Sequence, residues 1–317
     1  MRLRPIAVLS VAAAAALLLA GCSGGGENTA SPTPSAGASC LTDATAGDDS
    51  NAVTLADGDA LGATVPTDLA FGEIQRTITG GDGGDVLAAG SLVSGQYLIY
   101  DGATGELLLD SATTSASGDG LVPILIDDSA PTMWMAAIDC APLGSTVVMT
   151  VPGSAIGAAD SKYVVVARSA EELPTTATGV AQEPVAGAPE VTLAADGTPT
   201  VTIPDTAAPA DLQISVLKKG DGPTVADGDQ VVLQYLGVAW DTKEEFDSSW
   251  SRGRPSAFTT TGVYEGFGDA LVGQTVGSQV LVTMPPAMGA TSGDLVGKTL
   301  TFVIDILGTQ RVETATQ

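Results

Sequence analysis

The sequence predicts an α+β protein with two similar domains, each an antiparallel β-sheet packed on one short helix. The 317-residue chain contains a long internal repeat. Its regular segments alternate apolar and polar residues and are rich in Val, Ile, Leu and Thr, as strands are. The helix candidate is short and set off by glycines. Many strands with one short helix in each copy favour this fold class.

The repeat consists of three matched blocks that keep their order. EIQRTITGGDGGDVLAAG from Glu73 recurs as DLQISVLKKGDGPTVADG from Asp211. GQYLIYDGATGELLLDS recurs as LQYLGVAWDTKEEFDSS, and PLGSTVVMTVPG recurs as TVGSQVLVTMPP. Three blocks in one order indicate a duplication, with about 100 residues in each copy.

The beginning of the chain predicts export. Arg2 and Arg4 precede an apolar run, Ile6 to Leu19, that is too short to span a bilayer, and LAGC ends at Cys22. This ending resembles a bacterial lipobox, in which cleavage leaves the cysteine at the new N-terminus to carry lipid. An ordinary secretory signal with an incidental cysteine is the alternative. We predict a lipoprotein signal peptide over residues 1–21.

Residues 22–60 are predicted to form a flexible tether, because SGGGENTASPTPSAG is rich in Gly, Ser and Pro. Two further cysteines, Cys40 and Cys140, could pair in an oxidising exterior. A loop of roughly 100 residues closed in this way would contribute about 4.7 kcal/mol in the chain-entropy model. Two free thiols are the alternative.

Strands and the helix are expected within the two copies. In the first copy the strands are AGSLVSGQYLIYD, GSTVVMTV and KYVVVAR. In the second they are LQISVL, QVVLQYLGVAW, QVLVTM and TLTFVIDIL, with the helix at Gly268 to Val272. Residues 171–204 between the copies are rich in Pro, Ala, Gly and Thr without a helical period, which predicts an extended linker.

The composition excludes several kinds of ligand. A net charge of −25 argues against a nucleic-acid partner. The many acidic residues could form calcium sites, but they are scattered and the sequence has no EF-hand loop. A solvated acidic surface is therefore the preferred interpretation. The sequence has no histidine and no CxxC, so we expect no metal and no cofactor.

Four ordered blocks characterise the second copy: KKGDGPTVADGDQVVLQYLG, EEFDSSWSRGRPSAF, GVYEGFGDALVGQTVGSQVLVTMPP and TLTFVIDIL. Together they resemble an FKBP-type peptidyl-prolyl cis-trans isomerase domain from about Asp211 to Thr309. The resemblance implies an isomerase domain over residues 205–312 and a degenerate FKBP-like domain over residues 61–170.

Prolyl isomerisation suits a site without histidine. The X-Pro amide twists over a barrier of about 20 kcal/mol and no proton has to move. A dry aromatic pocket favours the twisted amide, which is less polar than the planar one. By resemblance, the catalytic residues are Tyr235, Phe246, Asp247, Val263, Tyr264, Phe267 and Phe302. The expected substrate contacts are Trp250, Phe258 and Met288.

Several of these residues have expected roles. Phe246 would form a wall of the pocket, Asp247 would stand near the substrate carbonyl or bond a neighbouring hydroxyl, and the Tyr235 hydroxyl could be that partner. The backbone N–H of Tyr264 would bind a substrate carbonyl. As alternatives, the aromatic residues could simply be core, and Asp247 could cap a turn.

Two positions of the second copy depart from the family pattern. Met288 and Ser256 stand where the family usually has aromatic residues, so an altered substrate preference is expected.

The first copy departs further. It is expected to keep Tyr97, Asp110 and Trp134, with Leu109 in place of the phenylalanine. Pro131 lies near the position of Tyr264 and has no N–H to donate. We therefore expect this copy to be structural or substrate-holding.

The predicted function is peptidyl-prolyl isomerisation that assists folding of exported proteins at the outer face of the cytoplasmic membrane. The expected partners are proline-containing segments of those proteins and, through the lipid, the membrane; we expect a monomer. Two alternatives remain open: a module that binds proline segments without catalysis, in a chaperone-like role, and a purely structural envelope protein.

Overall fold

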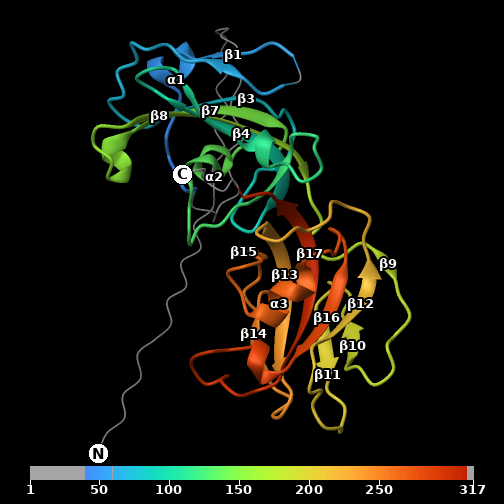
Figure 1. The fold of residues 1–317 in the computed structure, drawn as a ribbon. Coiled ribbons are helices and arrows are strands. Elements are labelled where there is room, and N and C mark those ends of the chain that lie inside the picture. The colour runs from blue at the N-terminus through green and yellow to red at the C-terminus, as the bar shows by residue number, and fades with distance from the viewer. Residues whose placement is uncertain (1–39, 59, 313–317) are drawn as a thin grey trace, which may run out of the picture. The chain divides into compact units, whose positions relative to one another are not determined.

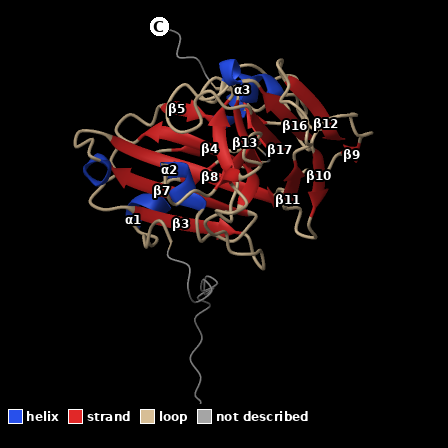
Figure 2. Cartoon of the chain, turned by 90° about the horizontal axis from the view of Figure 1, so that it is seen from below, coloured by secondary structure: helices blue, strands red, loops and turns tan. Residues whose placement is uncertain are grey.

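The structure, a computed structural model, describes residues 40–58 and 60–312 (Figure 1, Figure 2). The predicted signal peptide, Cys22 and the first part of the predicted tether lie outside the described residues. Within the described ranges, no helix combines the length and the apolar character needed to cross a membrane.

The first sheet is antiparallel and has six strands, in the order β3-β7-β8-β4-β5 with β6 paired to β4. The short helix α2 packs on one face of this sheet, where residues such as Val147, Val165 and Ala167 form the core. The elements are β3 (Gln75–Gly80), β4 (Leu92–Asp101), β5 (Leu107–Asp110), η1 (Ser111–Thr114), β6 (Val122–Leu125), α2 (Met133–Ile138), β7 (Ser145–Pro152), η2 (Gly153–Ile156) and β8 (Lys162–Glu172).

The other face of the first sheet is covered by residues that precede it. Val53, Val65 and Phe71 pack there against alternate residues of the strands, such as Tyr100 and Val166. The covering segment contains α1 (Asp48–Ala52), β1 (Thr54–Leu55) and β2 (Ala63–Thr64). Part of the predicted tether is thus folded, which the composition of its beginning did not indicate.

A disulfide fastens the start of the described chain to the first copy. Cys40 and Cys140 are bonded, with Cα atoms 5.7 Å apart. Next to this bond, the Leu41 N–H donates to Oδ2 of Asp139 at 2.6 Å. The predicted pairing is therefore present in the structure.

The second sheet is antiparallel and has seven strands, in the order β14-β13-β17-β16-β12-β9 with β15 paired to β13. Its elements are β12 (Gln213–Lys219), β13 (Gln230–Ala239), β14 (Glu245–Ser248), β15 (Ser256–Thr259), α3 (Glu265–Leu271), β16 (Gln279–Met284), η3 (Pro286–Met288) and β17 (Leu300–Gln310). Helix α3 begins three residues earlier than predicted, because the Tyr264 carbonyl accepts the N–H groups of Phe267 and Gly268.

The two faces of the second sheet carry different residues, as the period of two requires. Leu233 and Tyr235 of β13 belong to the core under α3. Leu236, Val238 and Trp240 belong to a separate apolar cluster on the other face. We call these the helix face and the back face.

The predicted linker contains three short strands. Strand β9 (Val180–Ala181) pairs with β12 at the edge of the second sheet, and β10 (Glu190–Leu193) pairs with β11 (Pro199–Thr202) in a hairpin (Figure 1). The turn sequence Asp-Gly between VTL and TVT is a typical hairpin signal.

The predicted fold class is confirmed: each copy is an antiparallel sheet with a short helix, and strands lie in all the ranges predicted within the two copies. The domain boundaries themselves stay predictions.

Candidate active site

Asp247 lies at the centre of a hydrogen-bonded group on the helix face of the second copy. Strand β14 presents the carboxylate beside β13, where the Tyr235 hydroxyl donates to Oδ2 at 2.5 Å. The Arg252 guanidinium bonds the other carboxylate oxygen and also donates to the Tyr235 hydroxyl at 2.7 Å. The guanidinium carbon of Arg252 stands 5.2 Å from the centre of the Tyr235 ring. Three side chains thus fix one another's orientation.

Aromatic rings surround this polar group. Phe302 of β17 lies edge to face with Phe246 at 5.4 Å and with Phe267 of α3 at 5.0 Å between centroids. The Tyr235 ring lies 5.8 Å from Phe258 and 6.1 Å from Phe267. Such tilted contacts are the favoured geometry of aromatic pairs. The rings form a rigid apolar wall.

The rings and the carboxylate line a cavity of about 560 Å³. The lining residues come from β13, β14, β15, β17, α3 and the loops beside them: Tyr235, Phe246, Asp247, Phe258, Gly262, Val263, Tyr264, Phe267, Leu295 and Phe302. A volume of this size accommodates a small ligand or one or two residues of a peptide.

Gly237 makes the ring arrangement possible. A Cβ atom at this residue of β13 would lie 2.6 Å from Cζ of Phe246 and 2.7 Å from Cε1 of Phe302. Since real Cβ contacts are never so short, any side chain here would displace one of the two rings.

Two members of the polar group have shifted pKa values. Burial, and then the hydrogen bond to Asp247, raise the pKa of Tyr235 to about 12, so its hydroxyl keeps its proton. Burial acts to lower the pKa of Arg252, but the bonds to Tyr235 and Asp247 outweigh it and raise that pKa. Tyr235 is therefore a permanent donor and Arg252 a permanent cation.

All seven predicted catalytic residues and Phe258 line the cavity. The other two predicted substrate contacts do not. Trp250 packs on the back face, because its loop turns it away from the cavity, and Met288 packs in the core beside α3. The structure therefore gives no cavity contact to Trp250 or Met288.

Sequence reasoning missed Arg252, Gly262 and Leu295. Two arginines in the loop that follows Asp247, in a chain with 12 basic residues, were a usable signal for Arg252. Leu295 lies in the irregular loop between β16 and β17, where periodicity gives no information.

The register of the first copy corrects two linked predictions, that Asp110 is the counterpart of Asp247 and that Leu109 replaces the phenylalanine. Leu98 pairs with Asp110 and Ile99 with Leu109, whereas Leu236 pairs with Ser248 and Gly237 with Asp247. Because Leu98 and Leu236 are equivalent, Asp110 corresponds to Ser248 and not to Asp247.

Apolar residues thus replace the Phe246–Asp247 pair in the first copy. Leu109 stands at the place of Asp247 and packs on the core, and Leu108 stands at the place of Phe246 and is 53% exposed. Asp110 instead accepts the Ala112 N–H at 2.9 Å and caps η1. The turn-capping role considered for Asp247 is found at Asp110.

The rings of the first copy are also arranged differently. Tyr97 stacks flat on Trp134 of α2, with centroids 4.5 Å apart and planes inclined by 3°. Ile124 and Val165 stand at the places of Phe258 and Phe302, as the pairings with Val93 and Ile99 show. The first copy therefore has no counterpart to the ring cluster on its described strands.

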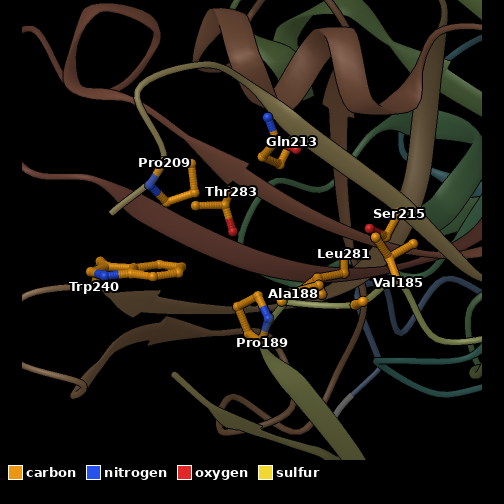
Figure 3. A pocket seen from close by; sticks show the side chains of 11 residues that line it. Val185, Ala188, Pro189, Pro209, Gln213, Ser215, Trp240, Leu281 and Thr283 are labelled. Atoms are coloured by element: carbon orange, nitrogen blue, oxygen red, sulfur yellow. The ribbon is translucent and has the colours of Figure 1, made fainter. Parts of the chain in front are cut away.

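A smaller cavity of about 210 Å³ lies on the back face of the second copy. Figure 3 shows Trp240, Pro189 and Pro209 around it, with Leu281 and Thr283 of β16 forming the sheet side. Its lining residues include no titratable side chain. It lacks the polar group that distinguishes the cavity on the helix face.

The cavity on the helix face of the second copy has the composition implied for a prolyl isomerase: an apolar space walled by aromatic rings, with one carboxylate held in place. The family model described as FKBP-type peptidyl-prolyl cis-trans isomerase matches residues 222–307.

Known proteins agree with the family model. A "Probable FK506-binding protein" of Corynebacterium glutamicum is 39% identical over 113 residues, which are 34% of this chain and 96% of that protein. The FK506-binding protein of Streptomyces anulatus is 38% identical over 117 residues, 34% of this chain and 94% of that one. The isomerase FkpA of Escherichia coli is 32% identical over 100 residues, 30% of this chain and 37% of FkpA. The chain belongs to the FKBP-type peptidyl-prolyl cis-trans isomerase family.

Proposed function

We propose that this isomerase is a lipid-anchored protein that assists the folding of exported proteins at the outer face of the cytoplasmic membrane, and that the second copy alone carries its chemistry. The observation that supports the assignment to the second copy is the cavity lined by Asp247 and Tyr235, with Arg252 bonded to both. The first copy has leucines at the places of Phe246 and Asp247.

In the proposed mechanism the rings favour the twisted amide. A proline ring enters between Phe246, Phe267 and Phe302, and water leaves. The planar amide loses more solvation than the twisted one, because resonance makes it more polar, so the barrier of about 20 kcal/mol falls. The cavity then needs no acid or base.

The polar groups orient the substrate. The carbonyl of Tyr264 begins α3, and its N–H is proposed to donate to a substrate carbonyl, as the family resemblance implies. Asp247 stands near the twisting amide, with Tyr235 and Arg252 holding its carboxylate. A fixed carboxylate costs no reorganisation during the reaction.

Two features support the extracytoplasmic location. LAGC before the mature chain resembles a lipobox, and the disulfide between Cys40 and Cys140 suits an oxidising compartment. Proline-containing segments of unfolded exported chains are the proposed partners, since slow prolyl steps delay folding there as elsewhere.

Membrane fractionation tests the anchor. The Cys22→Ser chain is expected in the soluble fraction of cells and the wild-type chain in the membrane fraction, because only a lipidated cysteine holds the latter. A Cys22→Ser chain that sediments with membranes would refute the lipid anchor. Cys40→Ser serves as the control, since it removes a cysteine without changing the anchor.

The assignment of the chemistry is tested by exchange of a proline-containing peptide. We expect the full chain to accelerate cis-trans exchange and the Phe302→Ala chain to lose most of that acceleration. Line broadening of the peptide without faster exchange would instead show a module that binds proline without catalysis.

A further inference from the structure

The loop that carries Arg252 has one apolar side chain. Residues 249–254 read Ser-Trp-Ser-Arg-Gly-Arg, and Trp250 is the exception among small and charged residues. The Ser249 carbonyl accepts the Arg252 N–H at 3.1 Å, and the Trp250 carbonyl accepts the Gly253 N–H at 2.9 Å. These two turns make the loop compact, so a displacement of Trp250 would also move Arg252.

The two side chains of this loop have opposite environments. Arg252 points toward the helix face, where it bonds Asp247 and Tyr235, two residues that line the cavity. Trp250 packs on the back face, in a cluster with Ile203 and Val201 of the linker and Trp240 of β13.

The linker itself is fixed to the back face at this cluster. Ile203 is only 4% exposed, and the indole N–H of Trp240 donates to the Thr206 carbonyl at 3.3 Å. Lys243 pairs with Asp205 in the same segment. The hairpin of β10 and β11 leads directly into this anchored segment (Figure 1).

The ion pair of Arg252 does not hold the loop by itself. The Arg252 side chain is 43% exposed and the Asp247 side chain 41% exposed. Exposed ion pairs between such side chains contribute little to the stability of a loop conformation. The apolar packing of the partly buried Trp250 side chain on the back face is a second restraint on the loop.

Trp250 is also retained at a cost. Its indole Nε1–H is buried and has no hydrogen-bond partner in the described part of the chain. A buried donor without a partner lowers stability. Phenylalanine has no such donor and keeps the ring contact, so it should hold the loop as well as tryptophan does.

The first copy lacks both side chains. Ser111 and Ser249 are equivalent, since each hydroxyl accepts the N–H of its tyrosine, Tyr97 or Tyr235, at 2.8 Å. Counting on from them, Ala112 and Thr114 stand where the second copy has Trp250 and Arg252. The two residues are present together in one copy and replaced together in the other.

We infer that Trp250 is a positioning residue: packed on the back-face cluster to which Ile203 and Val201 of the linker also belong, it sets the loop so that Arg252 holds Asp247 and Tyr235. The linker is thereby a brace for the active site, and we call these three residues the brace. This inference rests on the proposed role of the cavity and names residues outside it that determine its geometry.

The experiment compares Trp250→Ala, Trp250→Phe and Ile203→Ala in the full chain. Trp250→Ala should lower kcat/KM about fivefold, within the coupling range of contacting residues, and Ile203→Ala should act in the same direction but less. Trp250→Phe should retain wild-type kcat/KM. Leu193→Ala, on the exposed part of the same hairpin, is the matched control and should change nothing.

A double-mutant cycle separates positioning from packing. In an Arg252→Ala chain, adding Trp250→Ala should lower stability again but leave kcat/KM where Arg252→Ala left it. A further drop of about fivefold in that background would overturn the inference, because Trp250 would then act by another route.

NMR of the Arg252 guanidinium gives a readout that does not depend on activity. We expect separate Nη signals in the wild-type and Trp250→Phe chains and averaged signals in Trp250→Ala and Ile203→Ala. Unchanged signals in both alanine variants would overturn the inference. If the wild-type chain has no isomerase activity, the proposed function is refuted, but the Arg252 Nη signals still test whether the brace positions Arg252. If Trp250→Ala does not fold, the signals of Ile203→Ala and Val201→Ala provide the same test.

Discussion

The two copies share one scaffold and differ in what fills the space under the helix. The second has Gly237 between two phenylalanine rings, and the first has Ile99 at the same place in the sheet. Phe246 and Asp247 correspond to Leu108 and Leu109. The same scaffold therefore accepts either set of side chains, and the ring-walled cavity is a property of a few of them.

The first copy, which lacks the ring cluster, is stabilised by other features. The first has a disulfide and a folded cover on its outer face, and the second has neither of these but has the linker strands. Four variants test this contrast, and they follow in order of expected effect.

Loss of the disulfide should give the largest change. The Cys40→Ser, Cys140→Ser double variant is expected to lose about 4 kcal/mol of unfolding free energy in the first copy, because the loop of 100 residues between the cysteines is no longer closed. Native-state hydrogen exchange measures this: amides of β7 and β8 should lose protection while those of β16 and β17 keep it. Equal losses in both sheets would show that the bond does not act on the first copy alone.

Gly237→Ala should follow. Its Cβ would meet Phe246 and Phe302 well inside contact distance, so overpacking should cost about 1–3 kcal/mol. A displaced ring also narrows the cavity, and kcat/KM should fall about tenfold. Urea denaturation and peptide exchange measure the two effects. Ile99→Ala is the matched change in the first copy; it should lower stability and leave kcat/KM unaltered.

Asp247→Ala should lower kcat/KM about tenfold without unfolding the second copy, because the carboxylate is partly exposed and its loss leaves Tyr235 bonded to Arg252. Asp110→Ala should remove the cap of η1 and leave the rate alone. An unchanged rate in Asp247→Ala would remove this residue from the mechanism.

The smallest effect concerns pH. Asp305 of β17 and Arg168 of β8 occupy the same place, opposite Gln279 and Thr146. Burial raises the pKa of Asp305, against the Ala177 N–H, the Gln279 amide and Lys218, which lower it. The folded state thus binds this proton more tightly than the unfolded one.

The Asp305 contribution to stability is fully present below the unfolded value of 3.8 and is lost as pH rises through the raised folded pKa. Asp305→Asn should therefore flatten the fall in stability as pH rises from about 4 through the raised pKa of Asp305. Urea denaturation across this range is the measurement. A slope that is unchanged in Asp305→Asn would assign the pH dependence to other groups.

Alternation and the internal repeat were sufficient to predict the sheets and the fold class, because both follow from short-range patterns. The cavity residues came from family resemblance, and Tyr235 and Asp247 are bonded as expected. The one-residue error at Asp110 came from matching the Asp-Ser pairs of the two copies by residue type. Both hairpins have a bulge at the same place, between Ile99 and Tyr100 and between Gly237 and Val238, so the copies keep one register and Leu109 aligns with Asp247.

Long-range packing was beyond sequence reasoning. Trp250 follows the Phe246–Asp247 pair closely, which favoured the prediction of a cavity contact. Its side chain instead packs on a cluster that includes Ile203 of the linker, about 50 positions earlier. No local period links Trp250 with Ile203.

The most direct test gives the second copy the residues of the first. The full chain with Phe246→Leu and Asp247→Leu keeps both folds and carries leucine pairs in both copies. In NMR exchange spectroscopy with a proline-containing peptide, we predict that the wild-type chain accelerates exchange and that this variant leaves it at the rate of the peptide alone. Exchange that stays as fast as in the wild type would contradict the assignment of catalysis to the second copy.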